Sequence, residues 1–77
     1  MVSEKIKALL SLKGLKQADL AAYLGITPQS MRNKFARGSF SAEDLIKISV
    51  FVGCSLSFDI DGQQKITLTA DDIRPTD

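Results

Sequence analysis

The sequence feature that most constrains the fold is the stretch from Gln17 to Phe35, which contains two short helical patterns separated by a glycine. In the first pattern Leu20, Ala21 and Leu24 repeat with the 3.6-residue period of an amphipathic helix. Gly25 follows at the place where a helix ends in a left-handed residue, a conformation that glycine adopts without a Cβ clash. The stretch therefore predicts a short helix, a tight turn and a second helix.

The second helical pattern begins directly after this turn. Thr27 is expected to cap it, with Pro28 at the first helical position, where the missing N–H costs nothing. Ile26 and Met31 have the spacing of a hydrophobic staple, which fixes the angle of entry. Ala21 supplies a small side chain where the second helix crosses close to the first. Two helices held at a steep angle by a tight glycine-containing turn form a helix-turn-helix.

Length and composition narrow the class of protein. The 77 residues are enough for one small domain, and 44% hydrophobic residues is an ordinary fraction for a globular protein. No apolar run approaches the ~20 residues of a membrane span, and no secretory signal pattern is present. With no histidine and the single Cys54, an internal disulfide is ruled out, and a metal cluster or a His-based catalytic centre is nearly excluded. We expect no enzyme activity, cofactor or metal, a cytoplasmic location, and a partly buried, structural Cys54.

The charge is distributed unevenly along the chain. Residues 1–40 hold seven Lys or Arg against two acids, a balance of +5, whereas residues 41–77 hold three against seven, a balance of −4. The basic half is the half that contains the helix-turn-helix. This asymmetry indicates a polyanionic partner for one end of the molecule only.

Further elements flank the motif. A first helix is expected from a Ser3 cap to about Lys13, and a fourth from a Ser41 cap to Gly53. After Gly53 the apolar period changes from 3.6 to 2 on both sides of an Asp-Gly turn, which predicts a β-hairpin. The expected organisation is a helix-turn-helix domain (1–53), a hairpin extension of the same domain (54–70) and a frayed acidic tail (71–77).

Around the motif the sequence resembles the Cro/repressor-type (XRE family) helix-turn-helix regulators of phages and bacteria, over roughly residues 3 to 53. The matching residues are Gln17, Leu20, Ala21, Leu24, Gly25, Ile26 and Met31. The resemblance implies a mainly α fold, a four-helix lambda-repressor-like helix-turn-helix domain, here with a C-terminal β-hairpin.

Two positions depart from the pattern. Lys34 stands where an apolar residue is usual, so Phe35 is expected to take over the core contact, and Lys16 stands where a Ser or Thr cap is usual.

The second helix of the motif presents a polar face. Met31 and Phe35 define its buried side, so Gln29, Arg32 and Asn33 lie on or near the opposite side. Asn and Gln can pair with adenine in the major groove, and Arg with guanine. By the resemblance this helix lies in the major groove, and the candidates for base contacts are Gln29, Arg32 and Asn33, with Thr27 and Ser30 secondary. The alternative is an ordinary solvated helix face, and Arg32 can also serve a phosphate.

Phosphate contacts are expected around this helix. Gln17 opens the helix that crosses the DNA backbone, so its amide and the free N–H groups beside it can bind a phosphate. The candidate phosphate contacts are Gln17, Lys16, Lys34, Arg37, Ser39 and Ser41. For each, the alternative is a polar surface residue that serves solubility.

The predicted hairpin is the candidate dimerisation element, because its apolar face needs a cover. That face carries Leu56, Phe58, Ile60, Ile66 and Leu68. A second chain can join this face or an exposed strand edge of the hairpin, or the hairpin can pack back over the fourth helix of its own chain.

The sequence thus favours a nucleoid-associated regulator that binds double-stranded DNA site-specifically as a homodimer, most simply a transcriptional repressor. One alternative is a protein-interaction module that retains the fold, such as an antitoxin-like partner. A second alternative is a non-specific nucleic-acid binder.

Overall fold

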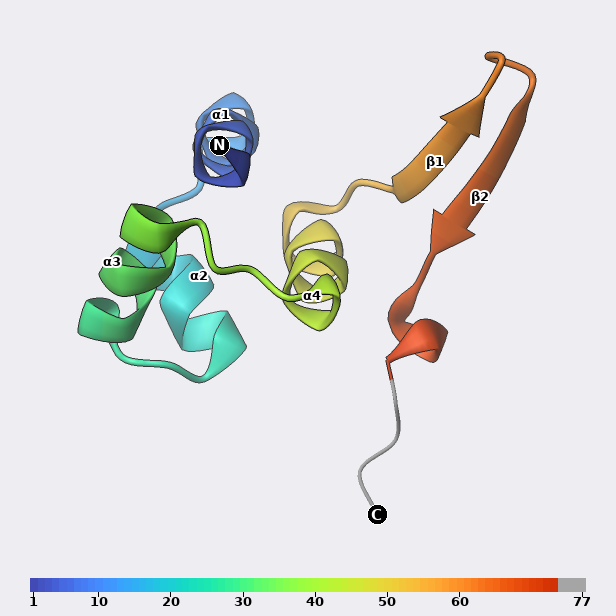
Figure 1. Ribbon diagram of the computed structural model, residues 1–77. Coiled ribbons are helices and arrows are strands. Elements are labelled where there is room, and N and C mark those ends of the chain that lie inside the picture. Colours follow the sequence, from blue (N-terminus) through green and yellow to red (C-terminus); the bar gives the residue numbers. More distant parts are fainter. Residues whose placement is uncertain (74–77) are drawn as a thin grey trace.

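The computed structural model describes residues 1–73, and it confirms a mainly helical domain with a C-terminal β-hairpin (Figure 1). Its elements in chain order are α1 (Val2–Lys13), α2 (Gln17–Leu24), α3 (Pro28–Arg37), α4 (Ala42–Val52), β1 (Leu56–Ile60), β2 (Gln64–Leu68) and the 3-10 helix η1 (Ala70–Asp72). The four helices gather into one body, and the hairpin projects from it on the far side of α4 (Figure 1).

The core lies between the four helices. Leu20, Met31 and Ile48, from α2, α3 and α4, are the largest of the fully buried side chains. Ala21 on α2 is 2% exposed, and α2 packs against α3. The buried cluster as a whole comprises Ile6, Leu10, Leu20, Ala21, Met31, Phe35, Ile48 and Val52.

The helix ends follow the local signals in the sequence. Gly25 ends α2 with φ 73° and ψ 30°, in the left-handed region that glycine tolerates. The Thr27 hydroxyl caps α3 by accepting from the Ser30 N–H at 3.1 Å, and Pro28 is the first residue of the helix. Ser41 and Asp44 form a reciprocal capping box at the start of α4. The turn and the cap thus fix how α3 begins after α2.

The predicted cap of the first helix was wrong. The helix begins at Val2 with Met1 at the N-cap, and Ser3 lies inside it, 3% exposed. The Ser3 Oγ donates to the carbonyl oxygen of Phe35 at 2.7 Å. The Ser39 N–H, which would meet that carbonyl in a continuing helix, bonds to the Lys34 carbonyl instead. The Ser3 hydroxyl therefore supplies a hydrogen bond to a carbonyl oxygen that lacks its helical N–H partner at the end of α3. The same bond links α1 to α3.

The hairpin has the predicted alternation. Leu56 pairs with Leu68 and Phe58 with Ile66 in an antiparallel register, so the apolar side chains share one face. Asp61 and Gly62 turn the chain with φ 55° and 70°. The predicted frayed tail is in part wrong, because Ala70–Asp72 form a 3-10 turn capped by Thr69. The rest of the tail, residues 74–77, lies outside the described residues.

Cys54 is exposed, which corrects the prediction of a partly buried residue. It follows α4 directly, in the segment that leads out to the hairpin, and so lies at the edge of the core. Among residues 1–73, no helix is both long enough and apolar enough to cross a membrane.

Candidate nucleic-acid interface

One side of α3 is fixed in the core and the other is free. Met31 and Phe35 are 2% and 6% exposed, which confirms the inward side predicted from the helical period, and Phe35 makes the expected core contact. Gln29, Arg32 and Asn33 are all exposed. Since no other described element covers them, this face is open to a partner.

The three exposed side chains are joined by hydrogen bonds. Arg32 Nη2 donates to Gln29 Oε1 at 2.7 Å, and Gln29 Nε2 donates to Asn33 Oδ1 at 3.3 Å. The Gln29 amide is thereby oriented at both ends, which leaves the Asn33 amide N–H groups and most of the Arg32 guanidinium N–H groups free. The surface therefore presents a row of polar groups with donors at both ends. Thr27 and Ser30, the secondary candidates, are exposed at the start of α3 and bonded to each other through the cap.

A hollow of about 210 Å³ separates the start of α2 from the start of α3. Gln17 and Ala18 line it from α2, and Pro28, Met31 and Arg32 line it from α3. The Lys16 N-cap makes no side-chain hydrogen bond, so the first N–H groups of α2 are uncapped by side chains. An uncapped helix N-terminus with an amide and a guanidinium nearby has the chemistry of an anion site.

Lys34 makes an intramolecular contact. Its Nζ lies 2.9 Å from Asp44 Oδ2 and 3.4 Å from the Ser39 carbonyl, with 26% of its side chain exposed. Burial raises the pKa of Asp44, but the hydrogen bond and charge of Lys34 and the hydrogen bonds from Ser41 outweigh it and hold that pKa below its usual value. Lys34 thus links α3 to the capping box of α4. This contact explains a charged residue at a position where the resemblance implies an apolar one.

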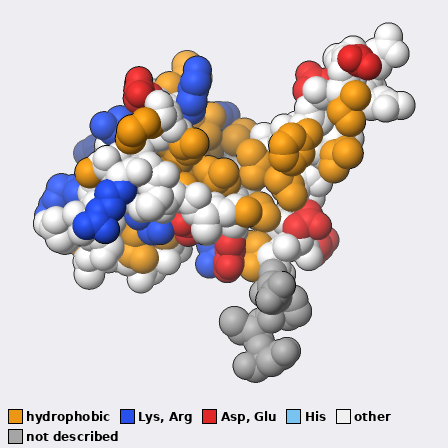
Figure 2. All heavy atoms as spheres, in the orientation of Figure 1, with side chains coloured by type: hydrophobic (Ala, Val, Ile, Leu, Met, Phe, Trp, Pro, Cys, Tyr) orange, Lys and Arg blue, Asp and Glu red, His pale blue; other side chains and the backbone are white. Residues whose placement is uncertain are grey.

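The other phosphate candidates lie on the surface around α3. Lys16, Gln17, Arg37 and Ser39 are exposed. Ser41 is exposed too, although its hydroxyl oxygen accepts the Asp44 N–H at 3.0 Å. Among residues 1–73, neither arginine of α3 forms a salt bridge, and the helix contains no acid. In Figure 2 the Lys and Arg side chains gather over the helical body, where some acidic side chains also lie, whereas the hairpin and its base show acidic side chains.

Comparisons with known proteins agree with this geometry. The family model described as the bacteriophage CI repressor helix-turn-helix domain matches residues 4–64. The chain belongs to this family. It is also 42% identical, over 62 residues, to the repressor protein CI of Enterobacteria phage phi80. The match covers 80% of this chain and 26% of that protein, so the chain spans about a quarter of the relative's length. No solved structure matches the chain significantly.

In this CI-type domain the family match extends past the four helices and through β1. The candidate dimerisation residues all lie on one face of the hairpin. Phe58 and Ile66 are 66% and 60% exposed and Ile60 is 41% exposed, whereas Leu56 and Leu68 at the base are partly buried. Packing over α4 therefore covers the base of this face and leaves most of it in solvent.

Sequence reasoning missed two side chains that position α3 in the CI-type domain. Serine is a residue type that commonly caps helices. Only the packing of α1 against the end of α3 shows that Ser3 bonds to the Phe35 carbonyl instead of capping its own helix. Asp44 completes the capping box of α4, and its second role depends on Lys34, ten residues earlier and one helix away. The sequence signal for this ion pair is Lys34 at a position that is usually apolar, followed by Asp44 at the start of the next helix.

Proposed function

We propose that this chain is a site-specific double-stranded DNA-binding repressor that works as a homodimer. The observation that carries the proposal is the exposed, hydrogen-bonded row of Gln29, Arg32 and Asn33, on an acid-free helix of a CI repressor-type domain. In such motifs the second helix enters the major groove with its N-terminal part toward the bases. Gln29, Arg32 and Asn33 all fall within the first six residues of α3.

The row suits direct reading of base edges. Arg32 retains enough free N–H groups to bind the O6 and N7 atoms of a guanine, and Asn33 or Gln29 can pair with the N6 and N7 atoms of an adenine. Thr27 and Ser30 are placed to contact a base or phosphate at the entry of the helix. Because Gln29 bridges the other two, exchanging it also changes how Arg32 and Asn33 are held.

Phosphate contacts would fix the register of the protein on the duplex. The uncapped start of α2 and the Gln17 amide supply one contact, beside the hollow between the starts of α2 and α3. The exposed side chains of Lys16, Arg37, Ser39 and Ser41 supply the others. Lys34 is left out of this set, because its ammonium group is already paired with Asp44.

A single helix of this size offers limited contact, and two copies on neighbouring half-sites would double it. The exposed hairpin face of Leu56, Phe58, Ile60, Ile66 and Leu68 is the proposed site of pairing. A dimer bound over a promoter would repress by blocking polymerase.

Selection of bound sequences from a random duplex pool tests the proposal. We expect one enriched half-site, repeated at a spacing of about one helical turn or a multiple of it. Asn33→Ala should then lose about 1–3 kcal/mol of discrimination at particular base pairs. Gln63→Ala, which removes an exposed amide from the hairpin turn, serves as the matched control and should leave the selection unchanged.

The exposed hairpin face also suits the alternative of a protein-interaction module. The same selection separates the two functions. A site-specific repressor prefers its operator over random duplex by orders of magnitude, whereas an interaction module enriches no sequence. A non-specific binder retains DNA but enriches none of it.

A further inference from the structure

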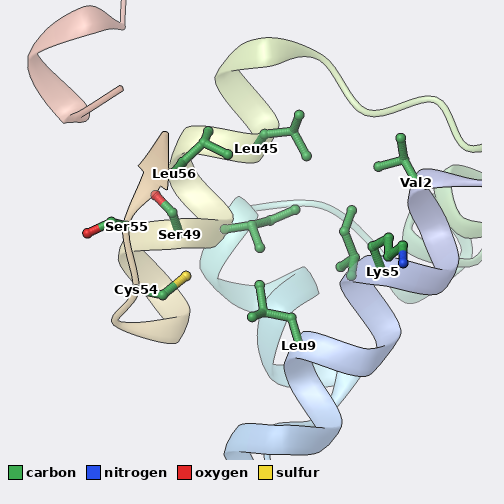
Figure 3. A pocket seen from close by; sticks show the side chains of 10 residues that line it. Val2, Lys5, Leu9, Leu45, Ser49, Cys54, Ser55 and Leu56 are labelled. Atoms are coloured by element: carbon green, nitrogen blue, oxygen red, sulfur yellow. The ribbon is translucent and has the colours of Figure 1, made fainter. Parts of the chain in front are cut away.

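An apolar groove runs between α1, α4 and the segment that leads into β1 (Figure 3). Its volume is about 290 Å³. Val2, Lys5 and Leu9 approach it from α1, Leu45 and Ser49 from α4, and Cys54 and Leu56 from the third side (Figure 3). Carbon dominates this lining.

The groove and the hairpin face are continuous. Leu56 lines the groove and is also the first residue of the apolar hairpin face, directly opposite Leu68. In Figure 2 hydrophobic side chains run without a break from the helical body onto the hairpin. One surface therefore contains both a hollow and a projecting apolar ridge, which is the shape that a two-fold symmetric contact needs.

We propose that the groove between α1 and α4 receives the hairpin of a second copy of this chain, reciprocally, so that each hairpin covers the other's groove. This inference rests on the homodimer of the proposed function and specifies how that dimer is built. Phe58 and Ile66, the most exposed pair of the hairpin face, are the side chains that enter the partner's groove.

The size of the hairpin favours this arrangement over two hairpins packed face to face. Two five-residue strands offer a face of only about 17 by 10 Å, from the rise per residue and the distance between strands. A stable specific interface buries about 800 Å² per partner. Face-to-face packing therefore falls short of that area and leaves both grooves in water, whereas reciprocal docking uses the whole apolar band.

Charge is complementary in the same arrangement. The hairpin carries Asp59 and Asp61 near its tip against the single Lys65. The groove is edged by Lys5, and α1 as a whole carries three lysines against one glutamate. Docking the hairpin along α1 of the partner brings its acidic tip toward this basic helix, which supports the pairing of the hairpin with the partner's groove.

The native Cys54 allows a direct test, because its sulfur lies at the groove and the chain has no other cysteine. The wild type is mixed with a Cys54→Ser/Ile66→Cys variant under mild oxidation. Reciprocal docking predicts a mixed disulfide between the two chains. The matched control is Cys54→Ser/Lys65→Cys, whose introduced thiol points to the other face of the same strand, and it should give at least ten-fold less mixed product.

Two results would overturn the inference. One is a Cys54→Ser/Ile66→Cys variant that cross-links mainly to itself, since that product means face-to-face hairpins. The other is a wild-type chain that sediments as a monomer up to high micromolar concentration. Ile66→Asp should raise the dimer dissociation constant at least 100-fold, and Thr67→Asp, on the opposite face, should change it less than three-fold. Failure here leaves DNA reading by α3 testable, because operator selection reports on that separately.

Discussion

The buried hydroxyl of Ser3 supplies the sharpest test of how α3 is held. Ser3→Ala removes the donor to the Phe35 carbonyl without creating a large cavity. Leaving a buried carbonyl without its partner costs about 1–3 kcal/mol, and the higher helix propensity of Ala returns about 0.5 kcal/mol of that. The expected net loss is about 0.5–2.5 kcal/mol, against the roughly 4–12 kcal/mol available to a chain of this length.

Thermal and urea unfolding measure this loss. For a domain of this size each kcal/mol moves Tm by about 4–8 °C, so Ser3→Ala should melt about 2–20 °C below the wild type. Ser11→Ala is the matched control, since it makes the same exchange on the same helix at an exposed position. It should be unchanged or about 0.5 kcal/mol more stable. Equal melting of the two variants would refute the role of the Ser3–Phe35 hydrogen bond.

Two further changes test the placement of α3. Asp44→Asn should cost about 1–2 kcal/mol at neutral pH by unpairing Lys34 and weakening the Ser41 cap. Since the folded pKa of Asp44 is lowered, its contribution is complete above the unfolded value of about 4 and is lost as pH falls through the folded value. The difference in free energy of unfolding between wild type and variant, measured in urea, should therefore shrink as the pH is lowered. A difference that does not change with pH would contradict this. Ala21→Leu should destabilise by about 1–3 kcal/mol, because the close packing of α2 and α3 has no room for it; an unchanged Tm would count against that packing.

The helices and their ends could be predicted because their signals are local. Gly25, Thr27 and Pro28 act within a few residues of one another, and the helical period places Met31 and Phe35 inward without reference to other elements. The outward position of Gln29 and Asn33 follows from the same period. The alternation after Gly53 likewise fixes both strands and their shared apolar face.

The errors occur where a side chain meets a distant element. Ser3 bonds to a residue 32 positions away, and nothing near it in the sequence distinguishes that contact from a cap. Lys34 looked free because its partner lies on the next helix. Exposure of Cys54 and of the hairpin face depends on where the chain leaves α4. In the row on α3 the exposure of Gln29, Arg32 and Asn33 follows from the helical period, whereas the hydrogen bonds between them depend on side-chain rotamers that the period does not fix.

The most direct test of the proposed base reading by α3 is a double-mutant cycle between this helix and a selected half-site. Once a half-site is selected, Asn33→Ala is combined with operators in which single adenines are replaced by 7-deazaadenine, which lacks the N7 acceptor. The same is done for Arg32→Ala with 7-deazaguanine. Reading of bases predicts that at one position for each side chain the two losses are coupled, by about 1–3 kcal/mol. Losses that add independently at every position of the half-site would contradict it.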